Sequence, residues 1–129
     1  MTIYGINNMK KKEINKEMGL PFDEMRQVII CIDVDGTLLD NTKNVEPPVA
    51  NERIRTLLIT LSSFKNVKII VWSGSGELWA RQASGILGID YYVSDYADKR
   101  DWKIIKPDIA IDDIQDTAIG KINLIVKEK

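Results

Sequence analysis

Three apolar runs that stop abruptly at polar residues constrain the fold more than any other feature of this sequence. Each run is short, rich in β-branched residues and almost unbroken, whereas a half-buried strand alternates apolar with polar residues. Unbroken runs of this length are typical of strands buried on both faces of a parallel sheet. The runs cover residues 28–32, 67–72 and 109–111, and they end at Asp33, Ser73 and Asp112, respectively.

The segments between these runs have helical periodicity. Apolar residues recur three and four positions apart over 49–65 and again over 77–87, and Gly88 is placed to cap the second helix. Two shorter apolar segments, 91–93 and 122–126, are predicted as a third strand and an edge strand. Alternating strands and helices predict an α/β fold, a single Rossmann-like parallel sheet of about five strands flanked by helices.

Length and local composition predict one domain with a polar extension. A chain of 129 residues that is 44% hydrophobic can bury one core but has no room for a second full domain. Residues 27–129 are predicted to form that core. Residues 1–26 are polar, and we expect a solvated helix from Asn8 to Met18 or an arm. The alternatives are an oligomer contact, or a nucleic-acid backbone contact through Lys10–Lys12.

Composition excludes several classes of chemistry. The chain has no histidine, which removes histidine-based catalytic triads and histidine-ligated zinc sites. Its 18 basic and 19 acidic residues leave a net charge of −1, so no overall field would attract nucleic acid. The one cysteine, Cys31, lies in an apolar run and is predicted to be a buried core residue. With no apolar segment resembling a signal peptide or a membrane span, we expect a cytoplasmic protein without a membrane partner.

The ends of the predicted strands indicate where a ligand would bind. Ligands of parallel α/β sheets bind beyond the carboxyl ends of the strands, and this edge gathers Asp33, Ser73 and Asp112. Asp35 follows Asp33 by two residues, and two carboxylates so close are costly unless a cation neutralises them. Mg2+ fits, because it prefers oxygen ligands and leaves positions for water and phosphate. Gly36 permits a tight turn whose backbone N–H groups can face an anion.

At these positions the sequence resembles a known family. Residues 33–38, Asp-Val-Asp-Gly-Thr-Leu, match DxDGT[L/V], the first motif of the haloacid dehalogenase superfamily, directly after a hydrophobic strand. Ser73 resembles the second motif, a serine or threonine at a strand end. Lys106 resembles the third-motif lysine, and it runs into Asp112-Asp113, which resemble the acidic fourth motif. The motifs occur in the family's order over 81 residues, from 33 to 113.

The resemblance implies a phosphoryl-transfer site. Asp33 would be the nucleophile that forms an aspartyl-phosphate, and Asp35 would protonate the leaving alcohol and then activate water. Lys106 would offset the charge of Asp33 and the phosphate, although Lys99 and Lys103 compete for this role. Phosphate would be bound by Gly36, Thr37, Ser73 and Gly74. Mg2+ would be held by the Asp33 carboxylate, the Asp35 backbone carbonyl, and Asp112 or Asp113, with Asp112 favoured as the direct ligand.

The spacing of the motifs leaves no room for the cap domain that members of this family usually carry. An open site needs a bulky substrate or a neighbouring subunit to exclude water. We therefore expect the substrate to be a nucleic-acid end or a phosphoprotein, or else a nucleotide or sugar phosphate processed by a homo-oligomer. The alternatives to a phosphatase are a phosphotransferase and a non-catalytic binding or assembly protein.

Trp72 and Trp79 are predicted as core residues, with contact to a base or sugar as the alternative.

Overall fold

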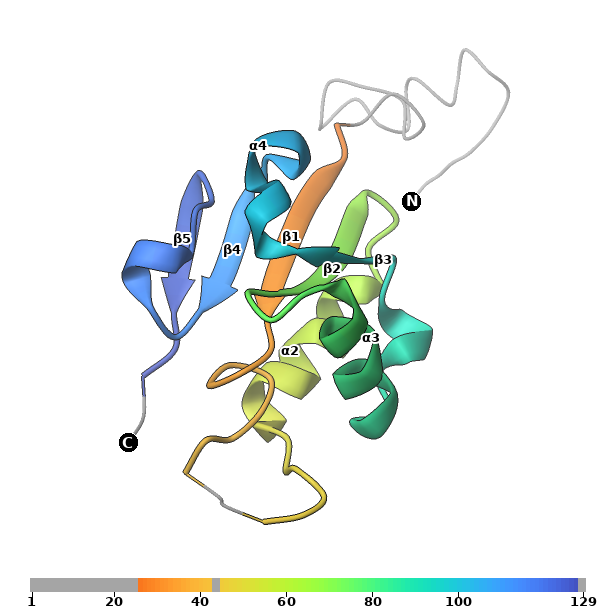
Figure 1. Ribbon diagram of the computed structural model, residues 1–129. Coiled ribbons are helices and arrows are strands. Elements are labelled where there is room, and N and C mark those ends of the chain that lie inside the picture. The colour runs from red at the N-terminus through yellow and green to blue at the C-terminus, as the bar shows by residue number, and fades with distance from the viewer. Residues whose placement is uncertain (1–25, 43–44, 128–129) are drawn as a thin grey trace, which may run out of the picture.

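Five parallel strands form a single sheet, which confirms the predicted fold class (Figure 1). The computed structural model describes residues 26–42 and 45–127, so the predictions for the N-terminal extension lie outside the described residues. The order of the strands across the sheet is β3-β2-β1-β4-β5. They are β1 (Val28–Asp33), β2 (Val67–Ser73), β3 (Asp95–Asp98), β4 (Ile109–Asp112) and β5 (Ile122–Ile125). As predicted, the last strand is at an edge.

The direction in which strands are added reverses at β1. The chain first builds outward from β1 through β2 to β3, then returns to the other side of β1 to add β4 and β5. In an open parallel sheet such a reversal separates the loops that follow the two central strands and leaves a crevice between them. The carboxyl ends of β1 and β4 are therefore the candidate position for a site.

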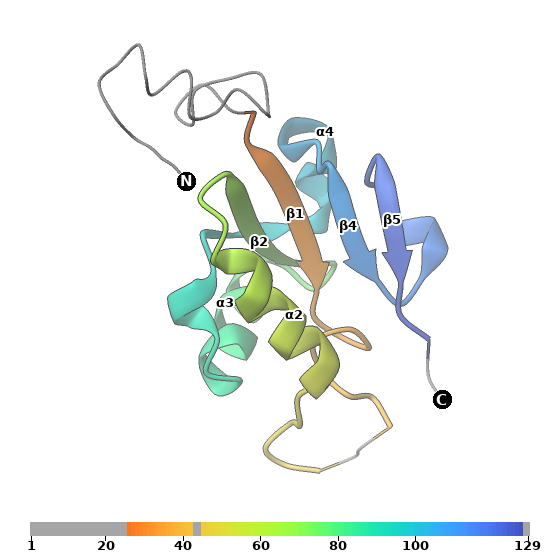
Figure 2. The same ribbon diagram turned by 180° about the vertical axis from the view of Figure 1, so that it is seen from behind.

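Helices α2 (Glu52–Ser62) and α3 (Glu77–Ile86) both pack on one face of the sheet (Figure 2). The two predicted helices, 49–65 and 77–87, are thus present with shorter bounds. They bury the larger core against alternate residues of the central strands. Its fully or nearly buried members include Ile30, Ile32, Leu58, Ile69, Val71, Ala80, Ala83 and Ile111.

The end of α3 confirms the predicted glycine cap. Gly88 has a φ of +69°, which is accessible to glycine at little cost. Its N–H donates to the carbonyl of Gly85, and the N–H of Ile89 donates to the carbonyl of Ser84 at 3.0 Å. These two bonds form a Schellman motif that satisfies carbonyls at the helix end. Ile89 is fully buried beyond the turn, so the cap also anchors the chain in the core.

The opposite face of the sheet is covered by less helical structure. The chain crosses it from β3 to β4 through the 3-10 helix η4 (Lys99–Asp101) and the single-turn α4 (Trp102–Ile105). Ile105 packs there against a smaller cluster, which comprises Cys31, Ile70, Trp72 and Ala97. Cys31 is fully buried, as predicted. Helical elements therefore do lie on both faces, but the two longer helices share one of them.

The prediction of a strand at residues 91–93 is wrong. Residues Asp90–Tyr92 form a 3-10 helix, η3, and Tyr91 is 89% exposed. The third strand is instead Asp95–Asp98, which pairs with β2 from Ile70 to Ser73. Its sequence, Asp-Tyr-Ala-Asp, has acidic residues at both ends because β3 is a short edge strand. The apolar pattern used to find buried strands is therefore absent from it.

No cap domain interrupts the motifs in the part of the chain that the structure describes, as the motif spacing predicts. The link from β1 to β2 holds one helix, α2, and the link from β2 to β3 holds α3 and η3. Among residues 26–42 and 45–127, no helix is long and apolar enough to cross a membrane.

Candidate active site

The strand register brings the first and last acidic motifs together. Ile32 of β1 is paired with Ile111 of β4, so Asp33 and Asp112 follow side by side at the ends of neighbouring strands. Because side chains alternate along a strand, both project from the same face as Cys31. This confirms that Asp33 and Asp112 lie together at one edge of the sheet, as expected from the sequence. They meet at β1 and β4, where the direction of strand addition reverses.

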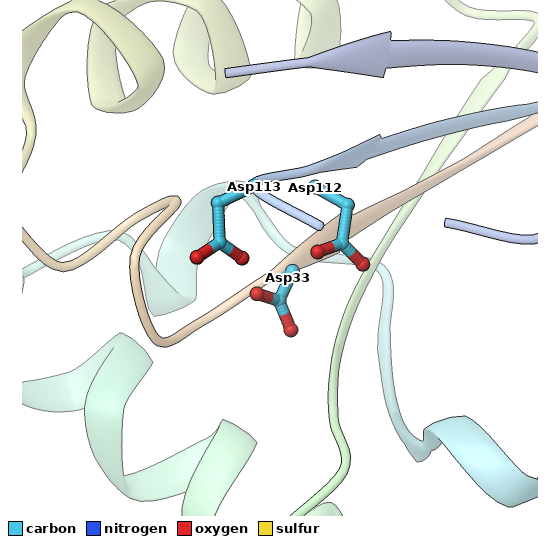
Figure 3. Close-up of side chains that lie close together, drawn as sticks. All are labelled: Asp33, Asp112 and Asp113. Carbon is cyan, nitrogen blue, oxygen red and sulfur yellow. The ribbon is translucent and has the colours of Figure 1, made fainter. Parts of the chain in front are cut away.

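Three carboxylates form a cluster at this edge (Figure 3). Asp33 comes from the end of β1, and Asp112 and Asp113 come from the end of β4 and the residue after it. One oxygen from each lies within 4.8 Å of the others. Asp33 and Asp112 are 6% and 1% exposed, whereas Asp113 is half-buried. Like charges at this spacing in a buried position need a positive partner.

That positive partner is Lys99, the first residue after β3. Its Nζ atom lies 2.9 Å from Asp33 Oδ1 and 2.5 Å from Asp112 Oδ2, and its side chain is only 13% exposed. The lysine therefore bridges the two buried carboxylates. The sequence offers Lys99 only as an alternative to Lys106, because the apolar pattern predicts the third strand at 91–93. With β3 at 95–98, Lys99 directly follows a strand end, at the same edge of the sheet as Asp33 and Asp112.

The structure corrects the assignment of the motif lysine to Lys106. Lys106 is exposed and precedes β4, at the opposite edge of the sheet from Asp112. The neighbouring Asp108 confirms this position, because its N–H donates to the carbonyl of Ile29 near the start of β1. Four strand residues at ~3.3 Å each separate this edge from the acidic cluster. The other alternative, Lys103, is exposed on α4 and lies over the Trp102 ring.

Asp112 is held by two donors besides Lys99. The N–H of Ile114 donates to its Oδ1 atom at 3.0 Å, and the Thr117 hydroxyl lies 3.3 Å from its Oδ2 atom. Both oxygens of this carboxylate therefore already accept hydrogen bonds within the protein. Thr117 was not singled out in the sequence, where nothing distinguishes it from other surface threonines.

Thr37 supports Asp33 from within the loop after β1. Its side chain is fully buried, and its hydroxyl donates to Asp33 Oδ2 at 3.2 Å. Its backbone N–H donates to the carbonyl of Val34. Both donors are therefore used within the loop, and the hydroxyl orients the Asp33 carboxylate; contact of Thr37 with substrate stays a prediction.

Gly36 lies against the acidic cluster. It has a φ of +79°, and a Cβ built on it would lie 2.1 Å from Asp113 Oδ2. A side chain cannot fit there unless Asp113 moves. The glycine therefore does more than permit the turn expected from the sequence, because it leaves space for one of the three carboxylates.

A small open pocket of about 240 Å³ joins most of the predicted residues. Ser73 lies in its wall, 1% exposed, and its Oγ accepts a hydrogen bond from the N–H of Ser75. Gly74 and Asp35 are exposed beside it. The residues lining the pocket are Asp33, Asp35, Ser73, Gly74, Ser75, Lys99, Asp112, Asp113, Ile114 and Thr117.

Three charged groups in this pocket, Asp33, Asp113 and Lys99, have shifted pKa values. Burial raises the pKa of Asp33 to about 7, with Lys99 opposing the shift and the carboxylates of Asp112 and Asp113 adding to it. Burial and the neighbouring Asp112 likewise raise the pKa of Asp113. Burial alone would lower the pKa of Lys99, but its bonds to Asp112 and Asp33 outweigh this and raise it. A carboxyl group with a strongly raised pKa in an open pocket, such as that of Asp33, is typical of functional sites.

Trp79 reaches the pocket from α3. Its ring packs partly against the core, and its indole N–H donates to Asp35 Oδ2 at 3.2 Å. The predicted core contact is thus present, and the contact with Asp35 was not foreseen. Trp72, in contrast, is fully buried in the smaller cluster, as predicted.

Comparison of the chain with protein-family models, with curated proteins and with solved structures finds no match.

Proposed function

We propose that this protein is a Mg2+-dependent phosphomonoester hydrolase of the haloacid dehalogenase type, with Asp33 as its nucleophile. The observation that carries the proposal is the position of Asp33. Its carboxylate lies at the end of a central strand, paired with Lys99, in the wall of an open pocket. The motifs at residues 33–38, 73 and 112–113 support the same reading, with Lys99 taking the part that the sequence suggested for Lys106.

The chemistry divides between Asp33 and Asp35. Asp33 Oδ1 or Oδ2 attacks phosphorus, and an aspartyl-phosphate forms as the bond to the leaving alcohol breaks. Asp35 supplies a proton to that alcohol and then takes one from the attacking water. Lys99 and the Ser73 hydroxyl, with the backbone N–H of Gly74, offset the charge on the phosphoryl oxygens.

The acidic cluster fits a divalent cation. Three carboxylates against the single Lys99 ammonium leave two negative charges unbalanced when all three are ionised. Burial raises the pKa values of Asp33 and Asp113, and the neighbouring carboxylates add to the rise. Oxygen ligands at this density suit Mg2+. Asp33, Asp112, Asp113 and the Asp35 carbonyl would hold it, and Mg2+ would supply positive charge to the transferred phosphoryl group.

Hydrolysis is favoured over phosphotransfer because Asp35 is exposed at an open pocket that water can enter. The same openness accommodates a phosphate on a nucleic-acid end or a phosphoprotein, as well as a nucleotide or a sugar phosphate. A substrate panel that covers these four classes would separate them. Binding of Mg2+ without turnover across the whole panel would favour the non-catalytic binding protein instead.

The proposal is tested by p-nitrophenyl phosphate turnover. We expect EDTA to abolish activity and excess Mg2+ to restore it, because the transferred phosphoryl group would lose the cation that offsets its charge. Asp33→Asn keeps the shape of the side chain but removes the nucleophile, so the rate should fall at least ~10³-fold. Asp90→Asn, at an exposed aspartate of η3 that does not line the pocket, serves as the control and should keep full activity.

Circular dichroism of each variant would show that the fold is retained. Activity that persists in Asp33→Asn, or that is indifferent to EDTA, would contradict the proposed function. Trapping of phosphate on the wild-type protein but not on Asp33→Asn would identify the covalent intermediate directly.

A further inference from the structure

The contact between Trp79 and Asp35 joins the two loops that carry the first and second motifs. Asp35 is in the loop after β1, and Trp79 is the third residue of α3, which follows the Ser73 loop after β2. The indole Nε1 lies 3.2 Å from Asp35 Oδ2, within hydrogen-bond distance. Among the hydrogen bonds of residues 26–42 and 45–127, this is the one that fixes the Asp35 carboxyl group.

Trp79 is itself held firmly. Its ring packs partly against the larger core, and α3 is anchored at its far end by the glycine cap at Gly88. A group that orients a reactive side chain is effective when its own rotamer is fixed by packing. Asp35, in contrast, is exposed, and without this bond its carboxyl group would rotate in solvent.

An indole N–H can only donate a hydrogen bond. The bond therefore requires Asp35 Oδ2 to be an acceptor whether the carboxyl group is charged or neutral. When the group carries a proton, the carbonyl oxygen is the better acceptor, so the bond to Oδ2 favours the proton on the other oxygen, Oδ1. The indole thus favours Oδ1 as the oxygen that exchanges the proton.

We propose that Trp79 is a positioning residue that holds the Asp35 carboxyl group with Oδ1 as its proton-transferring oxygen; this inference rests on the proposed function. In the first step the Oδ1 proton moves to the leaving alcohol oxygen as its bond to phosphorus breaks and the bond to Asp33 forms. In the second step Oδ1 receives a proton from water as the water oxygen bonds to phosphorus and the bond to Asp33 breaks. Protons and bonds balance over the two steps.

Leaving groups that differ in their need for a proton provide the test. p-Nitrophenolate leaves without protonation, whereas the leaving groups of phenyl phosphate and alkyl phosphates depend on the acid. Trp79→Phe keeps an aromatic ring in the core but removes the N–H. We expect kcat/KM for phenyl phosphate to fall about tenfold or more, with less than about a threefold fall for p-nitrophenyl phosphate.

Trp102→Phe is the matched control. Trp102 is 38% exposed on α4, and its ring lies beneath Lys103 rather than beside the pocket. It should leave both rates unchanged. If Trp79→Phe only loosened the packing, kcat/KM would fall equally for the two substrates. An equal fall for both substrates, or no fall for either, would overturn the inference while the proposed function stands. Wild-type protein inactive on both substrates would overturn the proposed function and the inference with it.

The hydrogen bond is also observable without turnover. In a ¹H–¹⁵N NMR correlation spectrum, the indole N–H signal of Trp79 is identified by its absence in Trp79→Phe. We expect its N–H to exchange slowly with solvent in the wild type and faster in Asp35→Ala, with the Trp102 signal unaffected. A Trp79 signal indifferent to Asp35→Ala would contradict the inference whatever the activity.

Discussion

Lys99 illustrates how one side chain can satisfy two buried acids. Its ammonium group contacts Asp33 and Asp112, and the two carboxylates belong to different strands. Breaking a buried pair by removing one partner leaves an uncompensated charge, which costs ~3–5 kcal/mol unless the acids take up protons. Here proton uptake is the easier response, because the pKa of Asp33 is already raised to about 7. A protonated Asp33 would be a poor nucleophile.

Lys99→Met and Lys106→Met therefore form a matched pair. Lys99→Met removes the charge beside Asp33 while keeping most of the side chain's length, and we expect the kcat/KM for p-nitrophenyl phosphate to fall ~10²–10³-fold. Lys106→Met, at the opposite edge of the sheet, should stay within about twofold of wild type. The reverse ranking in steady-state assays would restore Lys106 as the motif lysine.

The elements decide which polar residues reach the pocket. The loop after β1 supplies Asp33 and Asp35, and it is closed on itself by the bonds from Thr37 and Leu39 to the carbonyl of Val34. Within this tight loop Gly36 lies against Asp113, which belongs to a different element. The close approach couples the geometry of the two acidic motifs.

Gly36→Ala tests this coupling. The new methyl group would overlap Asp113 Oδ2 and force that carboxylate out of the cluster, with further strain from the positive φ. We expect weaker Mg2+ binding by calorimetry and a fall in activity of ~10²-fold.

Gly85→Ala is the control for a glycine whose replacement meets no obstacle. Nothing lies within 4 Å of a Cβ at this helical position, so the variant should be fully active and slightly more stable, by about 0.5–1 kcal/mol. Normal Mg2+ binding in Gly36→Ala would contradict the expected coupling, because it would show that the Asp113 side chain moves aside for the methyl group without weakening the metal site.

At the scale of the whole molecule, the buried carboxyl group of Asp33 opposes stability above its unfolded pKa. Between about pH 4 and pH 7 the folded protein retains a proton on Asp33 that the unfolded chain has released, because the pKa rises from 3.8 to about 7 on folding. More protons bound in the folded state mean that stability decreases as pH rises through this window. Three pKa units correspond to a decrease of ~4 kcal/mol at most.

Urea unfolding in EDTA at pH 5 and at pH 7.5 measures this effect. We expect the wild-type midpoint to be lower at pH 7.5 and the difference to shrink in Asp33→Asn, which has no proton to lose. At pH 7.5, Mg2+ at 100 times its dissociation constant should restore about 2.7 kcal/mol in the wild type. A wild-type midpoint that rises with pH in EDTA would contradict the assigned shift.

The sequence alone determined the parallel α/β class, four of the five strands, both long helices and the convergence of Asp33, Ser73 and Asp112. These features are predictable because buried strands and amphipathic helices differ in apolar periodicity, and because parallel strands end at a common edge. Gly88 was predictable for the same local reason, since a left-handed helix terminus favours glycine.

Only the tertiary structure decided the third strand and, with it, the lysine of the site. β3 is an edge strand with acidic ends, so its position comes from pairing with β2 rather than from any apolar pattern in its own residues. That pairing puts Lys99 beside Asp33 and leaves Lys106 at the far edge. Likewise, the contacts of Trp79 with Asp35 and of Gly36 with Asp113 join residues 44 and 77 positions apart, and packing rather than local sequence brings such residues together.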